Sequence, residues 1–94
     1  MALTWPAVKD PDEVKDYRLI WTNMLTGGDT ISSSVWTITA GTGLTIDSQA
    51  TENAETVVWL SGGVEGTNLT LLNEIVTTGG RTYQQSVKLR CRSK

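Results

Sequence analysis

The chain has 94 residues, a net charge of −2 at neutral pH, one cysteine and no histidine. A chain of this length builds one small domain, so we expect a single domain over residues 1–94, from which residues 1–14 can extend as an N-terminal arm. This inventory excludes an internal disulfide, a zinc site built from His and Cys ligands, and histidine-based nucleophilic catalysis. With no secretion signal and no apolar run of the ~18 residues that cross a bilayer, we expect synthesis in a reducing cytoplasm and no membrane partner.

The positive charge is concentrated at the C-terminal end of the chain. Residues 81–94 carry a formal charge of +5, whereas residues 1–80 carry −7. Such segregation indicates an electrostatic contact with a partner more than general solubility.

Short runs of β-branched and aromatic residues, separated by Gly, Asn and Asp, predict an all-β chain. The segment "LTWPAV" predicts a first strand that Pro6 confines to a sheet edge. A second strand is expected over residues 15–22, where alternation places Tyr17, Leu19 and Trp21 on one face.

Further strands are expected over residues 33–39, 44–47, 55–60 and 67–78, and after Gly80. The polar segment 48–55 is expected to be a loop. Gly79 and Gly80 predict a tight hairpin turn of the primed type, in which both glycines have positive φ. About seven short strands with turns every ~8 to 12 residues predict an Ig-like antiparallel β-sandwich, here without the Ig disulfide.

The last strand has two chemically different faces. If Val87, Leu89 and Cys91 face inward, alternation places three basic side chains on the outer face. We call these residues the basic stripe: Lys88, Arg90 and Arg92.

The preceding strand adds apolar surface beside this stripe. With Glu74 facing outward, Leu69, Leu71 and Ile75 face inward, but Leu72 and Val76 remain on the solvent face. Exposed apolar area of this kind tends to mark an interface.

The four tryptophans divide into two groups. Trp21, Trp36 and Trp59 lie in predicted strands, where the parity favours core positions. Trp5 precedes Pro6 near the N-terminus and is a candidate packing anchor for a neighbouring subunit. Tryptophans could instead line a carbohydrate or peptide groove.

Two charged segments allow more than one interpretation. Asp10, Asp12, Glu13 and Asp16 are either a solvated acidic lead or carboxylate ligands for a cation such as Ca²⁺, although the spacing of a calcium-binding hand is missing. The basic stripe could protect an exposed sheet edge or dock a partner. Nucleic acid is a weaker alternative, because the chain is acidic overall and shows no interleaved surface aromatics.

Several stretches in order along nearly the whole chain resemble a known family. They are "WPAVKDPDEVKDYRLIW", "GGDTISSSVWT", "TVVWLSGGVEGTNLTLLNEIVTTGGRT" and "VKLRCR". Together they resemble small tailed-bacteriophage virion proteins labelled phage fiber-tail adaptor proteins. The segment 41–55 matches this pattern least well.

The resemblance implies a virion structural protein with an Ig-like sandwich, made in the host bacterial cytoplasm and assembled in several copies near the tail or neck. It implies no enzyme activity. The expected partners are other virion proteins and further copies of the chain, with no cofactor, nucleic acid, membrane or small-molecule substrate.

The charge pattern adds a hypothesis about contact. The basic stripe would meet acidic residues of another copy or of an acidic virion partner, and the aliphatics beside the stripe would add apolar contact. The candidate contact residues are Lys88, Arg90, Arg92, Leu72, Val76, Trp5, Asp10, Asp12, Glu13 and Asp16. Head decoration, head completion and glycan binding are the alternative functions.

Overall fold

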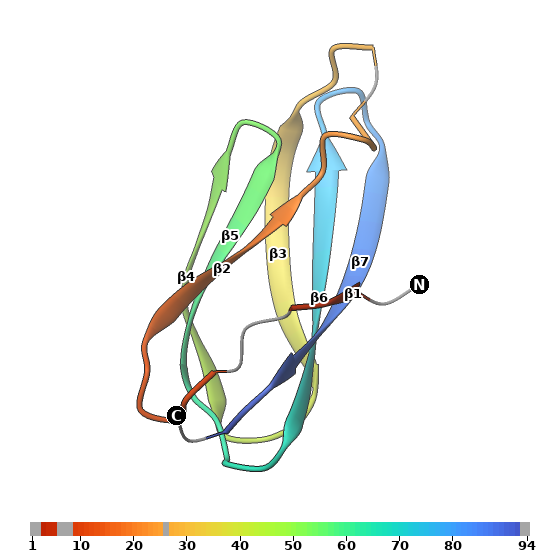
Figure 1. Ribbon diagram of the computed structural model, residues 1–94. Helices are drawn as coiled ribbons and strands as arrows, with labels where there is room; N and C mark the ends of the chain where they lie inside the picture. Colours follow the sequence, from red (N-terminus) through yellow and green to blue (C-terminus); the bar gives the residue numbers. More distant parts are fainter. Residues whose placement is uncertain (1–2, 6–8, 26, 93–94) are drawn as a thin grey trace.

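The computed structural model describes residues 3–5, 9–25 and 27–92, and it contains seven strands and no helix within them (Figure 1). The strands are β1 (Leu3–Thr4), β2 (Lys15–Ile20), β3 (Ile31–Ala40), β4 (Leu44–Glu52), β5 (Glu55–Gly62), β6 (Asn68–Thr77) and β7 (Thr82–Arg90).

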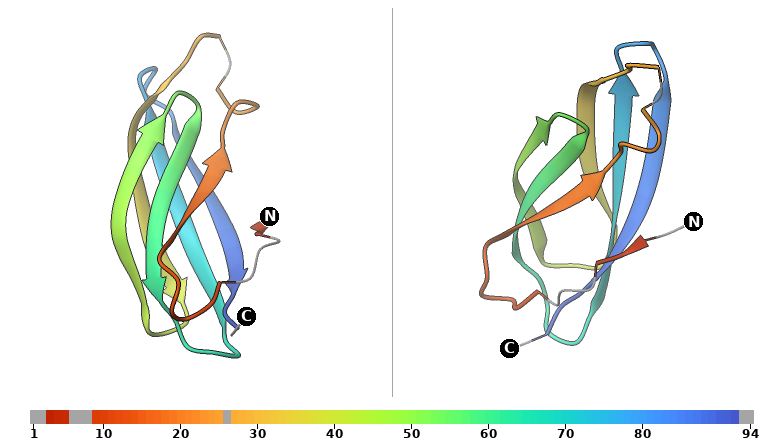
Figure 2. Two further views of the ribbon diagram at one scale, coloured as in Figure 1. Left: turned by 60° about the vertical axis from the view of Figure 1, so that its left-hand side comes forward. Right: turned by 45° about the horizontal axis from the view of Figure 1, so that its top comes forward.

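The strands form two sheets that pack face to face. One sheet has the order β1-β7-β6-β3 and the other has the order β2-β5-β4 (Figure 2). Every pairing is antiparallel except that of the short β1 with β7, which is parallel. The predicted all-β sandwich is therefore confirmed. The first strand lies at a sheet edge, as expected, while Pro6 lies outside the described residues.

The predicted loop over residues 48–55 is wrong. Strand β4 continues to Glu52, and the chain reverses at Asn53, whose φ of 54° is left-handed. The reason for the error is the position of β4 at a sheet edge, where both faces after Asp47 are exposed. A strand with two solvated faces has no apolar alternation by which to recognise it.

The hairpin between β6 and β7 is confirmed, but its predicted turn type is wrong. Gly80 has a φ of 86°, whereas Gly79 does not have a positive φ, and the loop spans residues 78–81. A Cβ at Gly79 would lie 2.5 Å from Nη1 of Arg81 and 3.1 Å from the Asp29 carboxylate, so the flexible end of the Arg81 side chain would have to shift. Hydrogen bonds from the Thr77 hydroxyl, the Gly79 N–H and the Thr78 hydroxyl hold the pKa of Asp29 well below its ordinary value.

The core lies between the two sheets and follows the predicted alternation on most strands. It is built from Tyr17, Leu19, Trp21, Trp36, Val58, Leu60, Leu69, Leu71, Ile75, Val87, Leu89 and Cys91. The core placement of Trp59 is wrong, because its side chain lies on the outer face of β5 and is 42% exposed. The inward positions of that strand belong to Val58 and Leu60, which are fully buried.

A buried polar cluster joins the two sheets. Asn73 of β6 accepts hydrogen bonds at Oδ1 from Nε1 of Trp21 (3.1 Å) and from the Thr56 hydroxyl (2.6 Å). Its amide Nδ2 donates to the Ser34 hydroxyl at 2.9 Å. Because these bonds connect β6 with β5, with the end of β2 and with β3, they fix the position of one sheet on the other.

The N-terminal segment closes the open side of the sandwich beside β7. The Trp5 N–H donates to the carbonyl of Lys88, the Lys9 N–H donates to that of Arg90, and the Arg92 N–H donates back to the carbonyl of Lys9. The described parts of this segment therefore line the C-terminal half of β7, which is no longer an open edge there.

Candidate functional site

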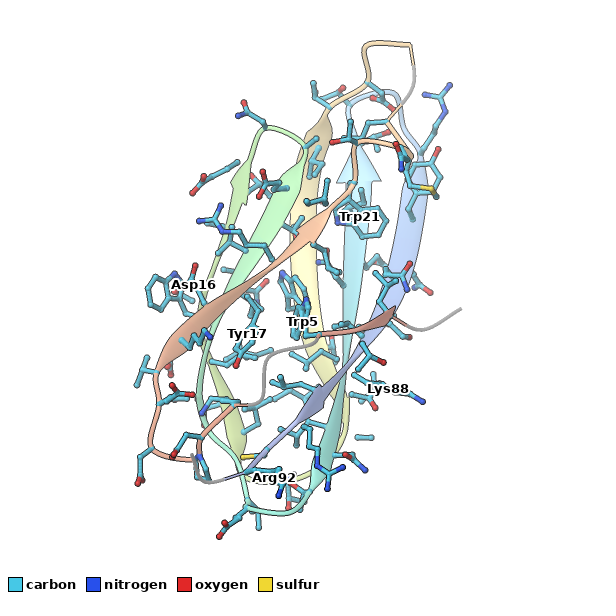
Figure 3. The ribbon with its side chains drawn as sticks, viewed as in Figure 1. Trp5, Asp16, Tyr17, Trp21, Lys88 and Arg92 are labelled. Atoms are coloured by element: carbon cyan, nitrogen blue, oxygen red, sulfur yellow. The ribbon has the colours of Figure 1, made fainter. Side chains whose placement is uncertain are left out.

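The three residues of the basic stripe point outward, as the alternation predicts. Lys88, Arg90 and Arg92 are exposed, while Val87, Leu89 and Cys91 between them are buried. Burial raises the pKa of the Cys91 thiol, which acts as a core side chain. Figure 3 shows Lys88 projecting away from the sandwich and Arg92 beyond the end of β7.

Lys88 and Arg90 line a hollow at one end of the four-stranded sheet. The hollow has a volume of about 520 Å³ and receives residues from all four strands of this sheet. We call it the basic hollow, and its lining is Thr4, Ala40, Asn68, Thr70, Lys88, Leu89 and Arg90. An ammonium, a guanidinium, hydroxyls and an amide together can donate hydrogen bonds to the oxygens of an anionic group.

Apolar side chains extend this surface along the outer face of the same sheet. Leu72 and Val76 lie on the outer face of β6, as expected, and are partly exposed. Val35 lies beside them on β3, opposite Glu74, and is 54% exposed. Sequence reasoning missed Val35, although its place next to the inward Trp36 was a usable signal.

The structure does not support the interpretation that the basic stripe protects an exposed sheet edge. The backbone of β7 beside Lys88 and Arg90 is already paired with Trp5 and Lys9 of the N-terminal segment. The basic side chains therefore stand on a sheet face, where a partner can reach them, rather than guarding an open edge.

The acidic lead does not form one continuous acidic surface. Asp10 and Glu13 face their own turn: the Asp12 N–H donates to Oδ1 of Asp10, and the Asp10 N–H donates to Oε1 of Glu13. Asp12 is exposed, and Asp16 lies 3.7 Å from the guanidinium of Arg18. Across the part of the chain that the structure describes, no group of three or more His, Cys, Asp or Glu could hold a metal ion.

Lys9 has a structural position that sequence reasoning missed. Its side chain is fully buried, and Nζ donates to the carbonyls of Asp10 (2.9 Å), Glu13 (2.7 Å) and Gly62 (2.6 Å). The lysine thus fastens the acidic turn to the end of β5. No local pattern signals this, because Gly62 is far away in sequence.

Trp5 packs within its own chain. Its ring stacks on Tyr17 with centroids 4.7 Å apart and lies 5.7 Å from the ring of Trp36. Its Nε1 donates to the carbonyl of Arg18 at 3.1 Å. The indole is half-buried against the core, so most of its contact surface serves the monomer.

The described residues include no helix long and apolar enough to cross a membrane. A protein-family model described as "Podophage GP4 fiber-tail adaptor protein gp77" matches residues 9–90, most of the chain. Among curated proteins, none matches it. The family name indicates a structural role in phage particles, which agrees with the resemblance seen in the sequence. The chain belongs to the podophage GP4 fiber-tail adaptor gp77 family.

Proposed function

We propose that this protein is a non-catalytic virion component that joins fibers to the tail or neck of the particle through protein contacts made by several copies. The basic hollow and the apolar residues beside it form the contact surface, and an acidic protein surface occupies it. The carrying observation is the convergence of Lys88 and Arg90 on one hollow in a member of a fiber-tail adaptor family.

The energetics favour repeated contacts. Exposed ion pairs typically contribute ~0 to 1 kcal/mol each, so two cations alone would hold a partner weakly. Burial of Leu72, Val76 and Val35 adds apolar contact at about 25 cal/mol per Å². Several equivalent copies in one particle multiply these small terms through a high effective concentration.

The function is tested by complementation of a phage whose copy of this gene is disrupted. Cells supply either the wild-type chain or the K88Q/R90Q variant, which keeps polar, hydrogen-bonding side chains at both positions while removing two charges. We expect particles made with the variant to contain at least tenfold less of this protein and correspondingly fewer fibers. Quantitative mass spectrometry of purified particles measures both.

The matched control is T22E/N23E, which changes the net charge by the same amount at exposed positions beyond the end of β2, at the far end of the sandwich from the hollow. This variant should incorporate normally, and all three chains should unfold at similar temperatures. Normal incorporation of K88Q/R90Q would contradict the proposed contact surface. Particles that carry a full set of fibers without the protein would contradict the adaptor role.

A further inference from the structure

The outer face of the β2-β5-β4 sheet exposes a tryptophan together with several carboxylate side chains. Trp59 lies on the central strand β5, and its cross-strand neighbours are Asp16 on β2 and Ser48 on β4. The indole is 42% exposed, and Ile20 on the same face is 73% exposed. Figure 3 shows Asp16 on the side of the molecule away from Lys88.

The charges on this face are mainly negative. Four carboxylates lie on this face, Asp16 and Asp47 beside Trp59 and the other two toward the opposite end of the strands. Arg18 is the only base among the outward residues of these three strands. We call this surface the Trp59 face, and it comprises Trp59, Ile20, Asp16, Asp47, Glu52 and Glu55.

Arg18 is already occupied by carboxylates of its own face. Its guanidinium lies 3.4 Å from Glu52, 3.4 Å from Glu55 and 3.7 Å from Asp16. These contacts leave a net charge of −3 on the face, so the Trp59 face attracts a cationic partner.

We propose that the Trp59 face binds the basic hollow of a second copy of this chain. This inference rests on the proposed function and names the occupant of its contact surface. Lys88 and Arg90 of one copy supply the charge that the four carboxylates of the next copy require. Trp59 and Ile20 then contact the partly exposed Leu72 and Val76, so apolar side chains alternate with charged ones on both surfaces.

The contact is heterologous because the two surfaces lie on the opposite outer faces of one sandwich (Figure 2). Each copy can therefore offer its Trp59 face to one neighbour and its basic hollow to another. Repetition of this contact forms a ring when the rotation between copies closes, and an open row when it does not.

The size of the surface predicts weak association outside the particle. Strand β2 has six residues, which corresponds to about 20 Å, and three strands span about 14 Å. The contact would bury about 600 to 900 Å² in total, which is below the ~1,200 Å² of stable interfaces. We therefore expect a monomer in dilute solution and association in concentrated solution.

Cysteine crosslinking tests the pairing directly. Ser48→Cys places a thiol beside Trp59, and Thr70→Cys places one beside Lys88, while the native Cys91 is fully buried. The full-length single variants are mixed at about 1 mM, where weak contacts are populated, and treated with a short bismaleimide. We expect a mixed S48C–T70C dimer as the main product, and a ladder of higher species from the chain carrying both substitutions.

The controls separate a specific contact from random collision. Adding W59A to S48C should reduce the mixed product at least fivefold, and pairing T22C with T70C should give little product. Dimers formed mainly within S48C alone, or a yield independent of Trp59, would overturn the inference. If K88Q/R90Q still fails to enter particles in that case, the proposed function stands and the basic hollow binds a different virion protein.

Discussion

Two regions of the interior differ in whether their buried polar atoms are hydrogen-bonded. Around Trp21, the indole N–H, the Thr56 hydroxyl and the Asn73 amide are joined in a buried hydrogen-bonded cluster. Around Trp5, the hydroxyl of Tyr17 and Nε1 of Trp36 are buried and find no hydrogen-bond partner among the described residues. In Figure 3, Trp21 lies above Tyr17 and Trp5.

This difference indicates which interactions stabilise each region. Hydrogen bonds have preferred distances and angles, so the Asn73 cluster fixes how one sheet lies on the other. Aromatic stacking and dispersion tolerate a wider range of distances and angles. The Trp5 region therefore covers the side of the sandwich through shape complementarity of its side chains. The first region should therefore tolerate substitution less well than the second.

The largest expected effect comes from Asn73→Ala. The substitution leaves the Thr56 hydroxyl without its acceptor and removes one of two acceptors of the Trp21 N–H. A cavity adds to this loss, and we expect the free energy of unfolding to fall by about 3 kcal/mol. Urea denaturation followed by circular dichroism measures the change.

Asn68→Ala is the matched control, because Asn68 lies exposed at the start of the same strand. It should change the stability by less than about 0.5 kcal/mol. Equal losses in the two variants would show that the buried cluster does not align the sheets.

A smaller effect is expected for Trp5→Ala. The variant loses the stack on Tyr17 and the bond to the Arg18 carbonyl, but the side chain is only half-buried. We expect a loss of about 2 kcal/mol in the same denaturation assay. Trp59→Ala, which removes an exposed indole of the same size, should cost less than 1 kcal/mol; the reverse order would contradict the intramolecular role of Trp5.

Where one face of a strand is apolar and the other polar, the sequence alone predicts the fold well. In β7, Val87 and Leu89 alternate with Lys88 and Arg90, so both the core positions and the basic stripe followed from a period of two. In β5, the run from Val57 to Leu60 is apolar at both parities. Alternation could not choose a face there, and Trp59 was assigned to the wrong one.

Contacts between distant segments could not be predicted in this way. The basic hollow depends on Ala40, Asn68 and Thr4 meeting Lys88 across four strands, which requires the registers of all three pairings. The burial of Lys9 depends on a carbonyl of β5. The residue types on the stripe were thus predictable, while the shape that makes them a candidate site was not.

The smallest effect at neutral pH, and the most specific one, is expected for Tyr17→Phe. The substitution keeps the ring under Trp5 and removes a hydroxyl without a partner among the described residues, so stability at pH 8 should change by less than about 0.5 kcal/mol. Burial, aided by the negative charge of Glu13, raises the pKa of Tyr17 to about 12.

The raised pKa of Tyr17 predicts that the stability of the fold depends on pH in alkaline solution. The folded state favours the neutral phenol, whereas the unfolded chain ionises near pH 10. The stabilising contribution is therefore complete below pH 10 and is lost as the pH rises through about 12. Between pH 8 and pH 11, the wild-type chain should lose more stability than Y17F in paired urea denaturations. Equal decreases in the free energy of unfolding of both proteins would mean that the Tyr17 hydroxyl contacts water in the folded state. The side chains of the Trp5 region would then not be tightly packed.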